Sequence, residues 1–233
     1  MNIVITGGTK GIGRAIAEKF AIEGNHILVC ARNSDDLIEM ESIFKNQFPR
    51  VYLHIYTCDL SIKEEVKKFS KFIFSTFSKV DIFVNNAGLF ENSALVEEED
   101  AIFERTMHTN LFSSYYLSKD IALEMKKEKS GIIFMIGSIA GTTAFVNCGA
   151  YTISKFAVHG LAKVLREELK SFGIKVSLII PGATYTSSWK GSNLSKDRFV
   201  DPQDVAEIIF TASQLSIGGL AEEISIQPLL GKI

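Results

Sequence analysis

Residues 2–13 read Asn2-Ile-Val-Ile-Thr-Gly-Gly-Thr-Lys-Gly-Ile-Gly13 and join a short apolar strand signal to a glycine-rich turn. A helical pattern over residues 12–24 follows directly. Gly7, Gly11 and Gly13 permit a tight turn and let backbone N–H groups approach a pyrophosphate at the helix N-terminus. The pattern by itself is equally consistent with an ordinary strand–helix turn. Its position between a strand and a helix favours a dinucleotide-binding fold.

The same alternation of strands and helices continues along the chain. Continuous apolar runs predict strands over Asn2–Thr6, Ile27–Ala31, Val51–Thr57, Ile82–Asn85, Ile132–Gly137, Ile174–Ile180 and Glu223–Gln227. Helical patterns cover residues 12–24, 34–47, 61–77, 99–129, 150–172 and 202–215. Runs of this kind are typical of strands that are buried on both faces. The order predicts an α/β fold with an open parallel sheet and helices on both faces.

Length, composition and charge restrict the kind of protein. A chain of 233 residues is long enough for one sizeable core, and it has no internal linker, so residues 1–233 are predicted to form a single domain. The net charge of -2 gives no electrostatic case for binding nucleic acid or an anionic membrane. The longest apolar stretches, such as residues 131–137, are too short to span a membrane.

The cysteines and histidines indicate neither a disulfide framework nor a metal site. Three scattered cysteines and four histidines show no metal-ligand spacing, and each histidine is more often structural or on the surface. The strand signal beginning at Asn2 leaves no room for a cleavable signal peptide. We therefore expect a reduced, cytoplasmic protein without a metal.

The end of the second predicted strand bears on the choice of dinucleotide. Arg32 lies nineteen residues after Gly13, where an acidic residue would accept hydrogen bonds from the ribose of NAD. Together with Lys10 in the glycine turn, Arg32 can clamp a 2′-phosphate. A solvated surface arginine is the alternative. The two cations predict NADP(H) rather than NAD(H).

Two further short motifs follow the third and fourth strands. Asp59 and Leu60 end the third strand, and Asn85-Asn-Ala-Gly88 ends the fourth. Ligands of open parallel sheets bind beyond the carboxyl ends of the strands, where both motifs fall. Asp59 could pair with the adenine amino group. Each motif in isolation is a weak turn signal.

The chemistry is indicated by Tyr151-Thr-Ile-Ser-Lys155, which begins thirteen residues after Ser138. Tyr151 and Lys155 are four residues apart on a predicted helix and therefore share one face. A phenol titrates near pH ~10, and a Lys ammonium one turn away favours the phenolate and lowers that pKa. The alternative is a packed tyrosine beside a solvated lysine.

Taken together, these motifs resemble the short-chain dehydrogenase/reductase family in its compact single-domain branch. The motifs that carry the resemblance are Thr6-Gly-x-x-x-Gly-Ile-Gly13, Asp59, Asn85-Asn-Ala-Gly88, Asn110, Ser138, Tyr151-x-x-x-Lys155 and Pro181-Gly182. The resemblance implies a Rossmann-type sheet of seven parallel strands, a nicotinamide cofactor, and NADPH-dependent reduction of ketones or aldehydes or the reverse oxidation of alcohols. It also implies a homodimer or homotetramer.

The resemblance assigns roles to four residues. Tyr151 would donate the proton to the carbonyl oxygen, and Lys155 would lower its pKa and hold the nicotinamide ribose. Ser138 would hydrogen-bond the substrate oxygen. Asn110 would support a water that links Lys155 to solvent. These four are the expected catalytic residues.

The wider site follows from the same motifs. The expected cofactor contacts are Gly7, Thr9, Lys10, Gly11, Ile12, Gly13, Arg32, Asp59, Leu60, Asn86, Ala87, Gly88, Tyr151, Lys155, Pro181, Gly182, Thr184 and Thr186. The expected substrate pocket comprises Leu89, Phe90, Thr142, Thr143, Phe145, Tyr185 and Trp189. The polar stretch between Thr186 and Val200 is a candidate lid. Thr184 departs from the aliphatic residue that the family usually has there.

The C-terminal end leaves the substrate open. Residues 222–233 lack the Gly-rich acidic tail of fatty-acid-type ketoreductases and resemble, loosely, the endings of sepiapterin-reductase-like and 3-hydroxy-acid-dehydrogenase-like members. A 3-oxoacyl-type or 3-hydroxy-acid oxidoreductase is one alternative. A catalytically silent NADP-binding regulatory module is another, although such modules typically lose the tyrosine or the lysine. A sugar-nucleotide epimerase would need a longer C-terminal region.

Overall fold

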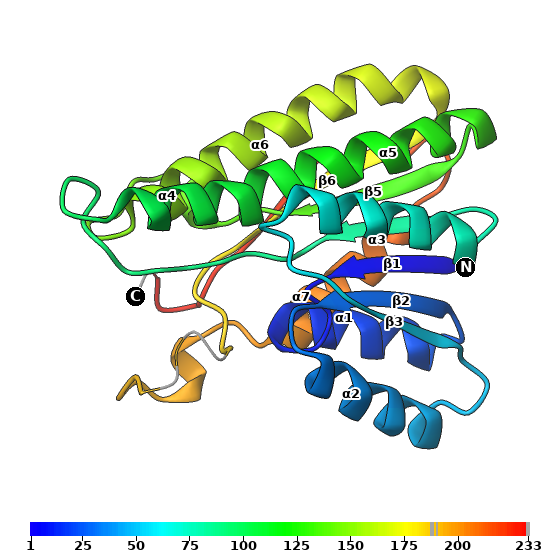
Figure 1. Cartoon of the computed structure of the whole chain (residues 1–233), viewed down its shortest axis with the longest axis horizontal. Coiled ribbons are helices and arrows are strands. Elements are labelled where there is room, and N and C mark those ends of the chain that lie inside the picture. The colour runs from blue at the N-terminus through cyan, green and yellow to red at the C-terminus, as the bar shows by residue number, and fades with distance from the viewer. Residues whose placement is uncertain (187–188, 190, 232–233) are drawn as a thin grey trace.

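A computed structural model describes residues 1–186, 189 and 191–231. Its centre is a seven-stranded parallel sheet with the order β3-β2-β1-β4-β5-β6-β7 (Figure 1). The strands are β1 (Asn2–Thr6), β2 (His26–Ala31), β3 (Leu53–Thr57), β4 (Ile82–Asn85), β5 (Gly131–Ile136), β6 (Ile174–Pro181) and β7 (Glu223–Ile226). This confirms the predicted α/β fold class and the number of strands.

Helices cover both faces of this sheet (Figure 1). The α-helices are α1 (Gly11–Ile22), α2 (Ser34–Gln47), α3 (Lys63–Thr76), α4 (Asp100–Met107), α5 (Ser113–Glu128), α6 (Gly149–Leu169) and α7 (Pro202–Ser213). Short helical turns are η1 (His108–Phe112), η2 (Ile139–Gly141), η3 (Lys170–Phe172) and η5 (Lys196–Arg198). Helices α3 to α6 lie on one face, and α1, α2 and α7 lie on the other.

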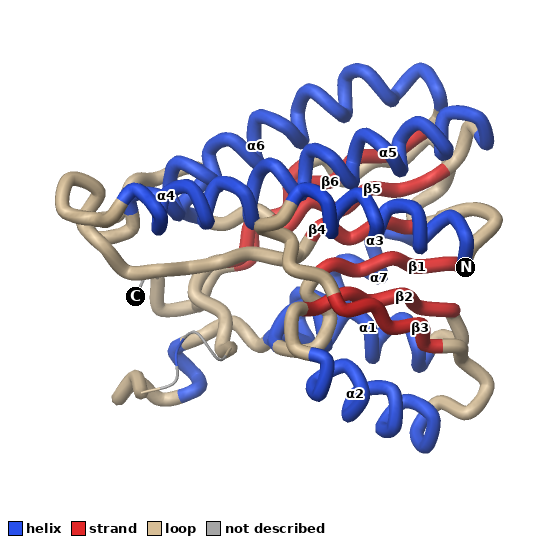
Figure 2. Tube along the Cα trace, viewed as in Figure 1, coloured by secondary structure: helices blue, strands red, loops and turns tan. Residues whose placement is uncertain are grey.

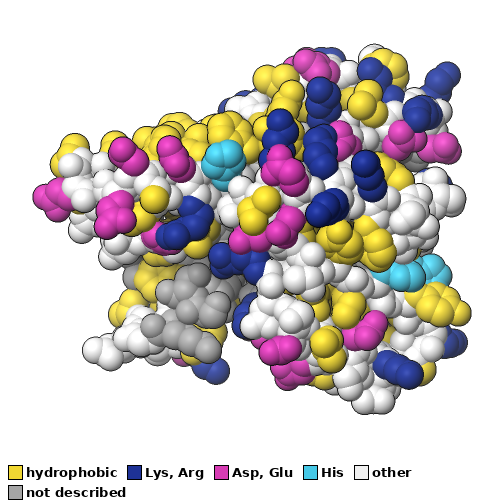
Figure 3. Space-filling model, in the orientation of Figure 1, with side chains coloured by type: hydrophobic (Ala, Val, Ile, Leu, Met, Phe, Trp, Pro, Cys, Tyr) yellow, Lys and Arg dark blue, Asp and Glu magenta, His cyan; other side chains and the backbone are white. Residues whose placement is uncertain are grey.

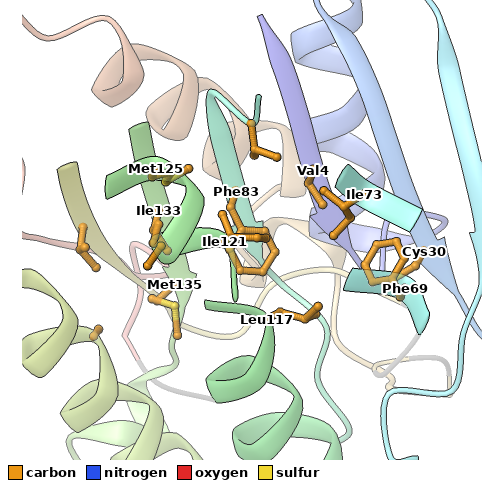
Figure 4. Packing of buried hydrophobic residues seen from close by; sticks show 14 of the residues in the cluster. Val4, Cys30, Phe69, Ile73, Phe83, Leu117, Ile121, Met125, Ile133 and Met135 are labelled. Carbon is orange, nitrogen blue, oxygen red and sulfur yellow. The ribbon is translucent and has the colours of Figure 1, made fainter. Parts of the chain in front are cut away.

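Each face of the sheet has its own hydrophobic core. In β1, Val4 packs into the core beneath α3, α5 and α6, whereas its neighbours Ile3 and Ile5 pack into the opposite core. Successive side chains of a strand point to opposite faces, so a strand covered on both sides must be apolar throughout. Figure 4 shows Phe83 of β4 and Ile121 of α5 packed together in the first core. Burial of each such side chain contributes about 1.5–3 kcal/mol.

The helix predicted over residues 99–129 differs from the observed structure in one respect. A π-helical turn, η1, separates α4 from α5, with Asn110 buried at its centre. A π-turn inserts one extra residue into a helix and is frequent at functional sites. Here the extra residue directs a polar side chain inward, and a pattern of apolar residues cannot indicate such a turn. The predicted end of this helix, at residue 129, is confirmed, since Lys129 ends α5 in a left-handed conformation with φ 48°.

The sheet topology determines where a ligand can approach. The chain leaves β1 with β2 on one side and β4 on the other, so the crossover connections diverge at the carboxyl end of β1. Such a divergence leaves a crevice in open parallel sheets. The strands run from right to left in Figure 1, and the longer loops lie at the left in Figure 2. Among the described helices, none is long and apolar enough to cross a membrane.

Candidate active site

A cleft of about 1040 Å³ opens at the carboxyl ends of the strands. It brings together Ser138, the predicted cofactor residues Gly7, Thr9, Lys10, Gly11, Ile12, Arg32, Leu60, Asn86, Ala87, Gly88, Tyr151, Lys155, Pro181, Gly182, Thr184 and Thr186, and the predicted substrate residues Leu89, Phe90, Phe145 and Trp189. Six predicted residues lie outside its lining: Gly13, Asp59, Asn110, Thr142, Thr143 and Tyr185. Motifs from six strand ends therefore meet in one place.

The glycine turn at the start of α1 forms the floor of one half of the cleft. Gly7 and Gly11 have φ values of 66° and 54°, which only glycine adopts without strain. A Cβ atom on Gly13 would lie 2.3 Å from the carbonyl oxygen of Gly7, so the helix can approach the turn only without a side chain there. The amide of Asn86 secures this geometry, because Nδ2 donates to the carbonyl oxygens of Thr6, at 2.9 Å, and Gly7, at 3.0 Å.

The N-terminus of α1 is suited to an anion. Among the described residues, no side chain caps this end of the helix, and its first turn carries no acidic residue. The first backbone N–H groups of a helix lack intrahelical partners, and the helix dipole makes this end electropositive. The turn can therefore hold a phosphate or pyrophosphate group.

The part of the cleft at the end of β2, where Arg32 lies, differs from the expectation. Arg32 lines the cleft, as predicted, but Lys10 Nζ forms an ion pair with Asp36 Oδ2 at 2.5 Å. The sequence analysis missed Asp36, which stands in the first turn of α2 beyond the Asn33 cap. Two cations and one carboxylate therefore share this part of the cleft. Lys10 is not a free cation here, and part of its charge is neutralised.

The residues after β3 also differ in part from the expectation. Asp59 lies outside the cleft lining, and its Oδ1 accepts hydrogen bonds from the backbone N–H of Ser61, at 2.9 Å, and from its hydroxyl, at 2.7 Å. This arrangement is an Asx turn that leads into α3. The neighbours Cys58 and Leu60 line the cleft instead.

Tyr151 and Lys155 lie on α6 with Lys155 beneath the tyrosine. Lys155 Nζ is 5.7 Å from the centre of the Tyr151 ring and donates to the carbonyl oxygen of Ile136 at 2.8 Å. Burial lowers the pKa of the Lys155 ammonium from 10.5 to about 8. This lysine is therefore held by the last residue of β5 and titrates close to physiological pH.

The pKa of Tyr151 corrects the sequence-based expectation. Burial raises the pKa of the phenol, and the side-chain hydrogen bond with Ser138 only partly opposes that effect. Desolvation disfavours the phenolate, and it is the largest cause of the shift at Tyr151. In this structure Tyr151 is consequently a protonated group, which can donate a proton and a hydrogen bond.

Asn110 acts through its neighbours rather than in the cleft. Its Oδ1 accepts from the Leu89 N–H at 2.7 Å, and its Nδ2 donates to Leu89 O at 3.0 Å and to Ser154 Oγ at 2.9 Å. The side chain thus clamps the loop after β4 to α6. The backbone carbonyl of Asn110 accepts from Ser114 Oγ at 2.6 Å. The water that Asn110 is expected to support stays a prediction.

Aromatic residues surround the other half of the cleft. Phe90 meets the Tyr151 ring edge-on, with ring centres 5.1 Å apart, and Trp189 packs against Phe199 with ring centres 5.0 Å apart.

Three residues of the candidate lid, 187, 188 and 190, lie outside the described residues. Within the described chain, no group of three His, Cys, Asp or Glu side chains could hold a metal ion. Sequence reasoning missed several lining residues of the cleft, among them Asn92, Thr109, Val146, Asn147 and Cys148. The last three directly precede α6, and that proximity to Tyr151 was the available signal.

Comparison with known protein sequences identifies a family. A model of the short chain dehydrogenase family matches residues 1–197. The sepiapterin reductase of Chlorobaculum tepidum is 30% identical, over 99% of this chain and 97% of its own length. An uncharacterized oxidoreductase of Staphylococcus aureus is also 30% identical, over 97% of this chain and 96% of its own.

Solved structures with the same fold carry related cofactors. A metagenomic short-chain oxidoreductase in complex with NADP has a TM-score of 0.85 at 27% identity, covering 98% of this chain and 96% of that one. L-sorbose reductase from Gluconobacter frateurii, complexed with NADPH and L-sorbose, has a TM-score of 0.88 at 26% identity, with coverages of 97% and 95%. An alcohol dehydrogenase from the archaeon Thermococcus sibiricus, complexed with 5-hydroxy-NADP, has a TM-score of 0.91 at 25% identity, with coverages of 100% and 98%.

Proposed function

This chain belongs to the short-chain dehydrogenase/reductase family, and we propose that it is an NADPH-dependent carbonyl reductase, active on ketones or aldehydes and reversible as an alcohol dehydrogenase. The observation that carries the proposal is the convergence of Tyr151, Ser138 and buried Lys155 in the cleft that also holds the glycine turn. The whole chain would act as one catalytic domain.

The residues of the cleft fit NADP(H). The glycine turn leaves no room for a Cβ on Gly13, as a close backbone approach to a pyrophosphate requires. Arg32 supplies a cation for a 2′-phosphate at the end of β2. NADPH, when bound, supplies the hydride. Relatives of similar fold are described in complex with NADP or NADPH, which supports the same choice.

The side chains of the cleft can supply a proton to the substrate oxygen and can stabilise the negative charge that develops on it. A carbonyl oxygen gains negative charge as its carbon is reduced, and hydrogen-bond donors at that oxygen stabilise the transition state. Ser138 and Tyr151 are adjacent donors on one wall. Tyr151, with its raised pKa, holds the proton that the oxygen requires. The Lys155 ammonium lies behind the phenol and stabilises the charge that forms on it when that proton leaves.

The substrate belongs to the carbonyl compounds that an aromatic-lined cleft accepts. Phe90, Phe145 and Trp189 line the open half, which supports a partly apolar substrate. Similarity to a sepiapterin reductase makes pterin side chains one candidate, and similarity to a sorbose reductase makes ketoses another. A 3-oxoacyl or 3-hydroxy-acid substrate remains the alternative within the family.

We also propose a homodimer or homotetramer that contacts through α5 and α6. Exposed apolar side chains form one stripe on each helix: Phe112, Tyr115 and Leu123 on the α5 side, and Ile153, Phe156 and Val164 on α6. Figure 3 shows hydrophobic side chains gathered along the upper edge, over α4 and α6. A helix that is apolar beyond its core-facing stripe needs a second partner. The free state of the three cysteines supports a reducing, cytoplasmic location.

The experiment is to follow NADPH oxidation by the purified protein with a panel of sepiapterin, diketones, ketoses, 3-oxoacyl esters and aromatic aldehydes. We expect turnover of at least one class, and none in Tyr151→Phe. Binding of NADPH without turnover of any class would overturn the proposal in favour of a silent NADP-binding module.

A further inference from the structure

His159 lies behind the catalytic residues and has no part in the chemistry proposed above. It stands on α6, one turn after Lys155 and two turns after Tyr151, and is only 6% exposed. A buried histidine on a packed helix face is commonly structural. The imidazole of His159, however, forms a hydrogen bond with the segment that carries Ser138.

The imidazole is an acceptor for the backbone of Ser138. The Ser138 N–H donates to His159 Nε2 at 3.4 Å. The Ser138 hydroxyl oxygen, in turn, accepts from the Ala140 N–H at 3.1 Å. Ser138 is therefore held at its backbone by α6 and at its side chain by the first turn of η2.

Two glycines flank this contact and fit the imidazole. A Cβ atom on Gly137 or on Gly141 would lie 2.4 Å from His159 Nε2, closer than any side chain permits. The segment from residue 137 to 141 thus folds around the ring, with the serine between the two glycines. A smaller side chain at position 159 would leave this segment without its support.

The contact requires a neutral imidazole, because an imidazolium has no lone pair to accept the N–H. Burial is the largest cause that lowers the pKa of His159, and the ammonium groups of Lys155 and Lys163 act in the same direction. Glu223 of β7 opposes them, as does a hydrogen bond with the backbone of Ser138, but the pKa is lowered on balance. Gly137 and Gly141, which lie against the ring, carry no charge. The surroundings therefore keep the ring neutral at physiological pH.

We infer that His159 is a positioning residue, which accepts the Ser138 N–H and thereby aims the Ser138 hydroxyl at the substrate oxygen. The inference rests on the proposed carbonyl reduction. A displacement of about 1 Å in a positioned group costs up to about a hundredfold in rate. We therefore expect loss of His159 to lower kcat about ten- to a hundredfold without weakening NADPH binding.

The test compares His159→Leu, which removes the acceptor, with His159→Gln, which keeps an acceptor oxygen, each with and without Ser138→Ala. We expect His159→Leu to lower kcat about ten- to a hundredfold, His159→Gln to recover part of it, and the dissociation constant of NADPH to stay unchanged. In the Ser138→Ala background His159→Leu should have no further effect. An equal loss of kcat in both backgrounds, or an unchanged kcat in the single variant, would overturn the inference.

A second readout does not depend on a substrate or on the stability of His159→Leu. Nitrogen NMR of the unmodified protein should find Nε2 of His159 without a proton at neutral pH and Nδ1 protonated. A proton on Nε2 would contradict the hydrogen bond and with it the inference. In kinetics, kcat should fall on the acid side as His159 becomes protonated, and this acid limb should be absent in His159→Gln. If the protein reduces no carbonyl compound, the proposed function is wrong. The NMR result still tests the hydrogen bond between Ser138 and His159 independently.

Discussion

The ammonium of Lys155 is held 2.8 Å from the carbonyl oxygen of Ile136, the last residue of β5. This bond joins the strand that precedes Ser138 to the helix that carries Tyr151. It also keeps the ammonium buried, where the surrounding groups solvate it less well than bulk water does. The lowered pKa of Lys155, about 8, follows from that burial.

The stability of the protein should depend on pH through Lys155. Because its pKa is about 8 in the folded chain and 10.5 in the unfolded chain, the unfolded chain binds more protons between these values. The free energy of unfolding should therefore rise with pH from about 8 to 10.5. Lys155→Met should remove this rise and increase stability at neutral pH by up to about 3 kcal/mol. Urea unfolding at several pH values measures both, and Lys163→Met, an exposed lysine on the same helix, is the control.

Tyr151→Phe should abolish most of the activity while leaving the fold intact. The substitution keeps the ring, which packs against Phe90, but deletes the proton donor and one of two donors to the substrate oxygen. Loss of one such group typically costs 10²–10⁴-fold, so turnover should drop by at least ~10³-fold with NADPH affinity nearly unchanged. Tyr185→Phe, a tyrosine outside the cleft lining, should be neutral. More than a tenth of normal turnover in Tyr151→Phe, when hydride transfer limits the rate, would exclude Tyr151 as the acid.

The corner formed by Arg32, Lys10 and Asp36 should set the cofactor preference. NADPH should bind at least about tenfold tighter than NADH, a difference of ~1.4 kcal/mol. Arg32→Asp should shrink or reverse the preference, whereas Asp36→Asn should increase it, because that change releases Lys10 from its ion pair. Arg50→Asp, at the opposite end of the strands, should have no effect. Titration by fluorescence or calorimetry measures each constant, and equal affinities in the unmodified protein would refute the assignment.

Two glycines should respond oppositely to alanine. Gly13→Ala places a Cβ 2.3 Å from a backbone oxygen of the glycine turn, so we expect a loss of about 1–3 kcal/mol in stability and weaker NADPH binding. Gly218, in the turn between α7 and β7, is not in the left-handed region, and a Cβ there would meet no neighbouring atom within 4 Å, so Gly218→Ala should stabilise the protein by about 0.4–1 kcal/mol. Thermal unfolding with and without NADPH separates the two effects. A neutral Gly13→Ala would contradict the close approach.

Assembly should depend on the apolar stripe of α6. Phe156 is 48% exposed, and Phe156→Glu should convert the predicted dimer or tetramer into smaller species. Ile22, 66% exposed at the end of α1, is the matched control, and Ile22→Glu should leave the assembly unchanged. Light scattering at micromolar concentration measures the mass. A strictly monomeric unmodified protein would refute the prediction.

The local patterns predicted the elements well because they depend on near neighbours in the chain. Continuous apolar runs identified all seven strands, and the spacing of Tyr151 and Lys155 put both side chains on one helix. The π-turn around Asn110 was not predicted, since its side chain is held by a pair of hydrogen bonds to Leu89, twenty-one residues away. The predicted lowering of the Tyr151 pKa was wrong for a similar reason, because burial comes from residues that only the fold assembles.

What the amino-acid sequence by itself determined is the fold class, the glycine turn and the order of the chemistry-bearing motifs. Periodicity, turn residues and residue spacing involve only a few neighbouring residues, so they can be recognised without a structure. Only the tertiary structure decided how these groups are paired: Lys10 with Asp36, Lys155 with Ile136, and His159 with Ser138. Hydrogen bonds and desolvation act through space, so partners brought together by parallel strands and their crossovers leave no local signal. The tuning of the site is therefore a property of the folded chain.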